Sequence, residues 1–143
     1  MFTQYDEYQR LMRYKNGYYA FHLMVILMIV NMAIVAAFDQ PWAEDSLVEF
    51  SFILAIPLMF MNIRNTWQGS QIDRREKPFI TYAIYLLLGL SSFWIVSRND
   101  MHLIQDGLVS IQAPQLLFGL VWFSTPFTYL VRYLFDRFRS ENK

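Results

Sequence analysis

The stretch YYAFHLMVILMIVNMAIVAAF, residues 18–38, decides how the rest of the chain can fold. It contains no aspartate, glutamate, lysine or arginine, and a helix of this length can cross the ~30 Å hydrocarbon core of a bilayer. The chain as a whole is 55% hydrophobic with a mean hydropathy of +0.23, which is more apolar than an ordinary soluble domain of 143 residues. We therefore predict that this stretch spans a membrane.

Three further apolar runs follow the first. Glu44 and Asp45 introduce the second run, since acidic residues stabilise the first turn of a helix. The third and fourth runs begin next to Pro78 and Pro114, where the missing N–H of proline costs nothing. The sequence thus predicts an all-α polytopic membrane protein, a four-transmembrane-helix bundle in a single domain, with spans at about 18–38, 43–64, 79–97 and 115–135.

Two other interpretations of the apolar runs exist. The first run ends in AIVAAF, which is similar to a signal-peptide cleavage site, but it is longer than a usual signal-peptide core and follows Asp6 and Glu7. A soluble bundle with an all-apolar core would have to cover four such runs with protein alone. We favour the membrane interpretation, in which the lipid bilayer is the first partner of the chain.

The basic residues indicate an orientation. Of the 12 lysines and arginines, all but Arg98 lie before the first span, from residue 64 to 77, or from residue 132 onward. Loops rich in lysine and arginine stay in the cytoplasm, so we expect both termini inside and residues 39–45 and 98–113 outside. This predicts a multi-pass protein of the cell membrane, specifically a bacterial cytoplasmic membrane.

Composition and motifs argue against several functions. Formal net charge is zero and there is no polybasic tract, so we expect no nucleic-acid partner. The absence of cysteine excludes disulfides and cysteine-ligated metals. His22 and His102 fall on opposite sides of the membrane in this topology and cannot share a metal ion. Since no phosphate loop or hydrolase motif is present, we expect no enzyme activity, no metal and no cofactor.

The segment before the first span is charged and amphipathic. Thr3 followed by Asp6 resembles a helix start, and Asp6 forms an i,i+4 pair with Arg10. A short amphipathic helix that lies on the cytoplasmic interface and bends at Asn16-Gly17 fits this pattern. A straight cytosolic extension of the first span fits it equally well, and either arrangement leaves residues 3–15 open to a protein partner.

The same segment carries a resemblance. YDEYQRLMRY, residues 5–14, before a first apolar run resembles the Asp-Glu-Tyr and Arg-Gln containing N-terminus of small multi-span membrane proteins of Gram-positive bacteria that have no assigned function. The resemblance covers about the first 30 residues. It implies an association with helix-turn-helix regulators or with peptide transporters, and it assigns a role to no residue.

Polar side chains inside the spans are candidate site residues, because polar groups are costly in lipid. His22 lies at the same expected depth as Asn62, Thr81 and Tyr85, and we interpret these side chains as hydrogen-bond partners between helices. Proton transfer is the alternative role for His22. The candidate intramembrane polar site comprises Glu49, His22, Asn31 and Asn62.

Glu49 is the one carboxylate at appreciable depth in a span. Arg98 is the only basic residue on the outer side, so we predict an outer ion pair between Glu49 and Arg98 that closes the end of the bundle. The alternative is a protonatable Glu49 in a pocket open to the outside, as a transporter would need.

The outer segment HLIQDGLVSI, residues 102–111, carries a turn signal. Both central residues of a type I′ turn have positive φ, which Asp106-Gly107 tolerates. We predict a small hairpin here, with an irregular loop on the membrane interface as the alternative. Small residues at i,i+4 spacing are candidate helix contacts: Ala33 with Ala37, and Ser124 with Thr128.

These features favour a small integral membrane accessory or regulatory protein that acts by protein–protein interaction. Its partner would be a membrane or cytoplasmic protein, or a second copy of the chain. The alternative is a small homo-oligomeric transporter with Glu49 as its protonatable site, similar in length and number of spans to small multidrug resistance proteins, whose embedded glutamate lies in the first span. The expected cytoplasmic partner surface comprises Asp6, Glu7, Arg10, Arg13, Arg74 and Arg75.

Overall fold

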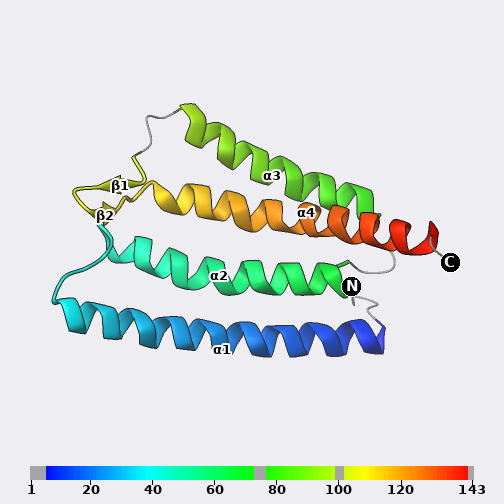
Figure 1. Ribbon diagram of the computed structural model, residues 1–143, viewed down its shortest axis with the longest axis horizontal. Coiled ribbons are helices and arrows are strands. Elements are labelled where there is room, and N and C mark those ends of the chain that lie inside the picture. Colours follow the sequence, from blue (N-terminus) through cyan, green and yellow to red (C-terminus); the bar gives the residue numbers. More distant parts are fainter. Residues whose placement is uncertain (1–5, 73–76, 99–101, 142–143) are drawn as a thin grey trace, which may run out of the picture.

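The computed structural model describes residues 6–72, 77–98 and 102–141, which form four long helices and one small hairpin (Figure 1). The all-helical architecture expected from the sequence is confirmed for these residues. The elements in chain order are α1 Glu7–Phe38, α2 Ser46–Trp67, α3 Pro78–Arg98, β1 Ile104–Gln105, β2 Leu108–Val109 and α4 Ala113–Glu141.

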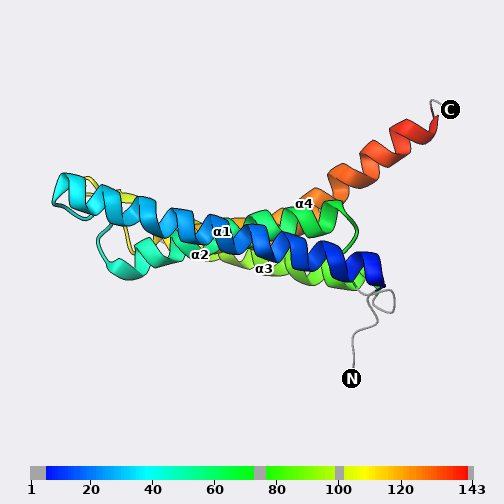
Figure 2. The same cartoon turned by 90° about the horizontal axis from the view of Figure 1, so that it is seen from below.

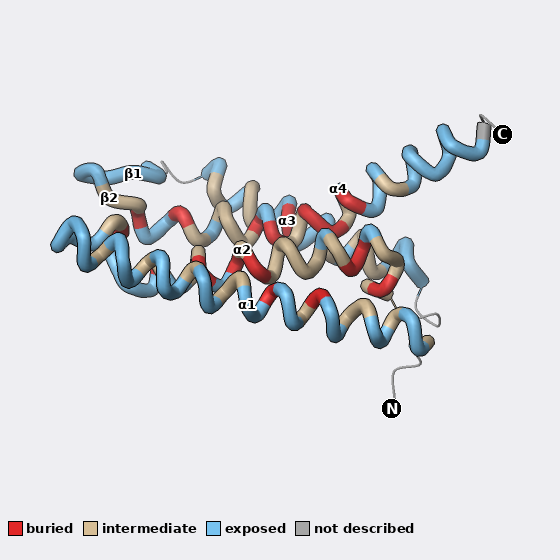
Figure 3. Tube along the Cα trace, turned by 60° about the horizontal axis from the view of Figure 1, so that its bottom comes forward, coloured by how far each residue is buried: buried red, intermediate tan, exposed pale blue. Residues whose placement is uncertain are grey.

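The four helices lie side by side in one layer (Figure 1). α1 packs against α2, α2 against α4, and α4 against α3. The layer does not close around a common core, and the buried residues follow the lines where neighbouring helices meet (Figure 3). The buried apolar residues are few and mostly small: Ala20, Ala43, Val48, Ile53, Ala55, Ala113 and Val121.

Within the described residues, three helices are long and apolar enough to cross a membrane: α1, α2 and α3. The fourth expected span lies in α4, which is not among them. α4 occupies an inner position of the layer, between α2 and α3, and it turns out of the layer in its second half (Figure 2). Pro126 lies inside this helix, where its missing N–H and its ring favour such a bend.

α1 is a single unbroken helix of 32 residues. Asp6 is its N-cap and forms a capping box with Gln9, whose backbone N–H donates to the Asp6 carboxylate at 2.6 Å. The straight extension of the first span is therefore correct, and the separate short amphipathic helix with a bend at Asn16-Gly17 is wrong. The helix continues there because Asn16 is fully buried against α2 and hydrogen-bonded to it.

The predicted hairpin is confirmed. Asp106 and Gly107 have φ values of 51° and 81°, the signs of a type I′ turn, and they join β1 to β2. The hairpin also holds the α1–α2 connection, since the Val109 N–H donates to the Trp42 carbonyl at 3.0 Å and the Glu44 N–H donates to the Val109 carbonyl at 3.0 Å. We call this end of the layer the hairpin end.

The opposite end of the layer holds the start of α1, the end of α2, the start of α3 and the end of α4 (Figure 1). The basic side chains Arg10, Arg13 and Arg132 belong to these segments. We call it the basic end. Successive helices run in opposite directions between the two ends, as in a chain threaded repeatedly through one layer (Figure 1).

α3 and α4 meet through two glycines. A Cβ added at Gly89 would lie 3.2 Å from the backbone nitrogen of Phe123 and 3.3 Å from the Gly119 carbonyl oxygen. A Cβ at Gly119 would lie 3.0 Å from the Cβ of Ser92. Of the small-residue pairs expected from the sequence, Ser124 and Thr128 are buried in α4, whereas Ala33 and Ala37 are exposed.

Candidate functional site

Two groups of polar side chains lie between helices, one at each end of the layer. At the basic end, the amide cluster consists of Asn16 on α1 with Asn65, Gln68 and Arg64 at the end of α2. At the hairpin end, the Glu49 cluster consists of Glu49 on α2, Asn31 on α1 and Trp42 between them in the chain.

The amide cluster is centred on Asn16. The Asn16 amide nitrogen donates to the side-chain oxygen of Asn65 at 2.7 Å and to that of Gln68 at 2.8 Å. Its oxygen accepts from the Arg64 guanidinium at 3.2 Å. Both amide hydrogens and the carbonyl oxygen are thus used, as a fully buried asparagine requires. The cluster fixes the register of α1 against α2.

The same end of α1 holds the α2–α3 connection. The Gln9 amide donates to the carbonyl of Gly69 at 2.9 Å and to that of Ile72 at 3.3 Å. Arg13 donates to the Gln71 carbonyl at 3.3 Å. These carbonyls follow the end of α2 and have no helical partner, so side chains of α1 satisfy the connection in place of backbone hydrogen bonds.

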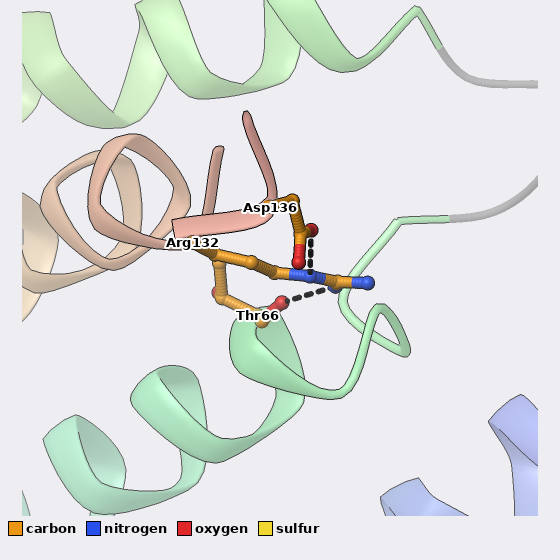
Figure 4. A network of polar contacts seen from close by, with 3 residues as sticks. All are labelled: Thr66, Arg132 and Asp136. Carbon is orange, nitrogen blue, oxygen red and sulfur yellow. Dashed lines mark hydrogen bonds and ion pairs between the residues drawn. The ribbon is translucent and has the colours of Figure 1, made fainter. Parts of the chain in front are cut away.

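Arg132 links α4 to the last turn of α2 (Figure 4). Its guanidinium donates to the Thr66 carbonyl at 3.0 Å and lies 3.7 Å from the carboxylate of Asp136. A Cβ added at Gly69, which has a φ of 71°, would lie 2.9 Å from the Arg132 guanidinium. Glycine at this position therefore admits both the left-handed backbone and the close approach of Arg132.

In the Glu49 cluster, Trp42 orients Asn31 and Asn31 orients Glu49. The Trp42 indole N–H donates to the Asn31 side-chain oxygen, and the Asn31 amide donates to one carboxylate oxygen of Glu49 at 2.9 Å. Beside the cluster, between α1 and α2, lies a small apolar pocket of about 170 Å³ whose lining includes Leu27, Ile34 and Phe52. The second carboxylate oxygen of Glu49 has no partner among the described residues.

The ion pair expected between Glu49 and Arg98 does not form in the described structure. The Arg98 guanidinium lies over the ring of Trp94 on its own helix, 4.7 Å from the ring centre. The helix order explains this, because α4 lies between α2 and α3. A depth estimate from the sequence places the two residues on the same side but cannot give the order of the helices.

The predicted hydrogen bonds around His22 are not made either. His22 is exposed and shares a hydrogen bond of 2.9 Å with the Tyr18 carbonyl of its own helix. Asn62 makes no hydrogen bond with another described residue, and the Tyr85 hydroxyl accepts from Gln71 at 3.4 Å. Of the four candidate polar residues, only Glu49 and Asn31 come together.

The residues expected to form the cytoplasmic partner surface differ in what they do. Asp6 caps α1 and Arg13 binds the α2–α3 connection, whereas Glu7 and Arg10 are exposed. Arg74 and Arg75 lie outside the described residues. The described residues of the expected partner surface therefore include some that build the fold and some that are exposed.

The first turns of α1 also carry a row of exposed apolar and aromatic side chains. The aromatic stripe, which we define as Tyr8, Leu11, Tyr14 and Tyr18, lies on the face of α1 opposite Gln9, Arg13 and Asn16. Its side chains are 56%, 60%, 74% and 61% exposed. The sequence indicates this stripe through the three- and four-residue spacing from Tyr8 to Tyr18, because residues at this spacing share one helix face.

The described residues contain no group of three or more histidine, aspartate or glutamate side chains that could hold a metal ion. No family model, no curated protein and no solved structure matches the chain. Its function must therefore be inferred from its own geometry.

Proposed function

We propose that this chain is a small integral membrane protein with four spans and both termini in the cytoplasm, and that it acts as an accessory or regulatory subunit by binding another protein at its basic end. The apolar length of α1, α2 and α3 supports membrane insertion. α4 completes the set as a span shielded by its neighbours: Ser124, Thr125 and Thr128 are buried within the layer rather than presented to lipid.

The aromatic stripe carries the proposal. The 32 residues of α1 reach about 48 Å, which exceeds a hydrocarbon core of about 30 Å by several turns. In the proposed orientation the excess lies on the cytoplasmic side, because the uncharged run of α1 begins only at Tyr18. Tyr8, Leu11 and Tyr14 then project beyond the hydrocarbon as an exposed apolar surface of the kind that binds a partner.

The contacts behind the stripe present it in a fixed orientation. Gln9, Arg13 and Asn16 attach the opposite face of α1 to α2 and to the connection that follows it. A partner that binds the stripe therefore meets a preformed surface and loses less conformational entropy than it would on a flexible segment.

Photo-crosslinking tests the proposal. With the photoreactive amino acid p-benzoylphenylalanine in place of Tyr14, we expect one protein to be crosslinked in stoichiometric amounts in the native membrane. Replacing Tyr8, Leu11 and Tyr14 together by serine should lower co-purification of that protein by about tenfold or more, as the loss of a hot spot does. The matched control replaces three exposed apolar residues at the hairpin end, Leu103, Ile104 and Ile111, by serine. Equal losses in both variants would contradict the proposal.

A second candidate function is transport by a homo-oligomer. It is favoured by the Glu49 carboxylate, which has an amide donor and no cationic partner among the described residues and lies beside an apolar pocket. A self-only oligomer whose ligand binding is abolished by Glu49→Gln would support transport in place of regulation.

A further inference from the structure

Besides the small pocket next to Glu49, an apolar groove lies between α3 and α4 at the basic end. Its volume is about 490 Å³, within the range of small-molecule sites. Its walls are almost entirely hydrocarbon and aromatic rings. The groove is lined on α3 by Pro78, Tyr82 and Leu86 and on α4 by Phe123, Pro126 and Leu130, among others.

The position of the groove matches one leaflet of a bilayer. Pro78 is the first residue of α3, and the eight-residue step to Leu86 covers about 12 Å along the helix. Half of a hydrocarbon core of about 30 Å is of similar length. In the proposed orientation the groove therefore begins at the cytoplasmic boundary and ends near the middle of the membrane, as the tail of a cytoplasmic-leaflet lipid does.

The cytoplasmic half of the groove carries hydroxyl donors, and a positive charge lies at its mouth. The rings of Tyr82 and Tyr129 are stacked with centres 4.1 Å apart, and neither hydroxyl makes a hydrogen bond with the described part of the chain. Lys77, the exposed residue directly before α3, supplies a cation at the mouth of the groove.

We infer that this groove binds one anionic phospholipid of the cytoplasmic leaflet, with an acyl chain between α3 and α4 and its phosphate between the ammonium of Lys77 and the hydroxyls of Tyr82 and Tyr129. Phenolic hydroxyls and cations satisfy a phosphate, and the hydrocarbon walls satisfy the tail. The inference rests on the proposed span topology. It is independent of any protein partner at the aromatic stripe.

A photoreactive lipid tests this inference. The full-length protein is reconstituted in phosphatidylcholine vesicles that contain phosphatidylglycerol with a diazirine in its tail, floated to confirm incorporation, and irradiated. We expect mass spectrometry to find the label on Ala83 and Phe127 in preference to the apolar face of α1. Ala83→Trp, which fills the groove, should lower this labelling about tenfold, the change expected when about 1.4 kcal/mol of binding energy is lost. The matched control, Ala33→Trp, changes an exposed alanine of α1 and should have no effect.

Two further variants separate charge recognition from phosphate binding and packing. Lys77→Gln leaves the groove walls unchanged and should bring labelling by phosphatidylglycerol down to that by the matched phosphatidylcholine probe, because the two lipids share a phosphate and differ in net charge. Tyr82→Phe combined with Tyr129→Phe keeps both rings and should lower labelling by both probes, because the phosphate that they share loses its donors. Equal labelling of α1 and the groove, equal labelling by both lipids in the wild type, or a disulfide between two copies of Ala83→Cys would overturn the inference and leave the proposed function standing. Failure to float with the vesicles would overturn both.

Discussion

At the residue scale, Asn16 shows how a polar side chain can hold two apolar helices together. It is completely buried, and each of its polar atoms has a partner on α2. A buried amide that lost these partners would cost more than the hydrogen bonds contribute, since the groups left behind stay desolvated. The arrangement therefore favours a single register of α1 against α2 over neighbouring ones.

The substitution Asn16→Ala tests this role. It removes the amide that donates to Asn65 and Gln68 and the oxygen that accepts from Arg64, so we expect the free energy of unfolding to fall by about 1–3 kcal/mol. Unfolding by sodium dodecyl sulfate from mild detergent micelles, followed by circular dichroism, measures the change. Asn62→Ala is the matched control on the same helix as Asn65 and should change stability by less than about 0.5 kcal/mol. Equal effects of both variants would contradict the assigned role.

Only part of the amide cluster and of the Glu49 cluster could be predicted from the sequence. Glu49 and Asn31 were singled out because polar groups in an apolar run stand out, but their pairing depends on which helices are neighbours. Asn16 was interpreted as a break because Asn-Gly is a turn signal. Burial against α2 overrides that local preference, and only the tertiary structure reveals it.

At the element scale, the crossing of α3 and α4 depends on two glycines. At Gly89 a side chain would meet the backbone of α4, and backbone cannot move aside as a flexible side chain does. Gly17 on α1 is the opposite case, because nothing lies within 4 Å of its added Cβ. The two positions form a natural pair for measuring what close helix approach contributes.

We expect Gly89→Leu to lower the free energy of unfolding by about 1–3 kcal/mol, because α3 must separate from α4 to accommodate the side chain. Gly17→Ala should raise it by about 0.5–1 kcal/mol, since alanine costs less backbone entropy in a helix. The same detergent unfolding measurement compares them. A stable Gly89→Leu variant would show that the helices do not approach closely at this point.

The hairpin offers a second test at this scale. Gly107 has a φ of 81°, and a β-branched residue there is strained by about 1–2 kcal/mol. Gly107→Val should therefore loosen the hairpin and speed hydrogen exchange of the amides of Glu44 and Val109, whose bonds join it to the α1–α2 connection. The substitution Gln105→Thr, on the exposed strand β1, is the control and should leave both rates unchanged. Unchanged exchange in Gly107→Val would contradict the role assigned to the turn.

The helices themselves were largely predictable, because apolar runs of about 20 residues favour helices over strands and loops. The expected spans 43–64 and 79–97 correspond to α2 Ser46–Trp67 and α3 Pro78–Arg98. Asp45 and Pro78 mark the starts, since an N-cap acid and a first-turn proline are local signals. The ends were less predictable because contacts from other helices, such as that of Gln68 with Asn16, fix them.

At the scale of the whole molecule, the open layer leaves many large apolar side chains exposed. Phe21, Ile29 and Leu87 are each more than half exposed, and many others are similar. A soluble protein rarely exposes so much apolar surface, whereas a bilayer solvates it. The order of the helices could not be predicted from the sequence, because spans that are apolar all round do not mark the face that meets a neighbour.

The exposed apolar side chains determine how the protein behaves in solution. We expect the purified chain to be monodisperse in mild detergent and to aggregate when the detergent is removed, because water then meets the exposed apolar faces. Size-exclusion chromatography with light scattering distinguishes the two states. A folded, monodisperse species in plain buffer would contradict membrane insertion.

Cysteine accessibility tests the proposed membrane topology. The chain has no cysteine, so single substitutions report one position each. We introduce Gln71→Cys and Ser140→Cys at the basic end and Asp106→Cys at the hairpin turn, and treat intact cells with a membrane-impermeant maleimide. We expect only Asp106→Cys to react in intact cells, and all three variants to react once the membrane is permeabilised. Labelling of Gln71→Cys or Ser140→Cys in intact cells, or protection of Asp106→Cys, would contradict it.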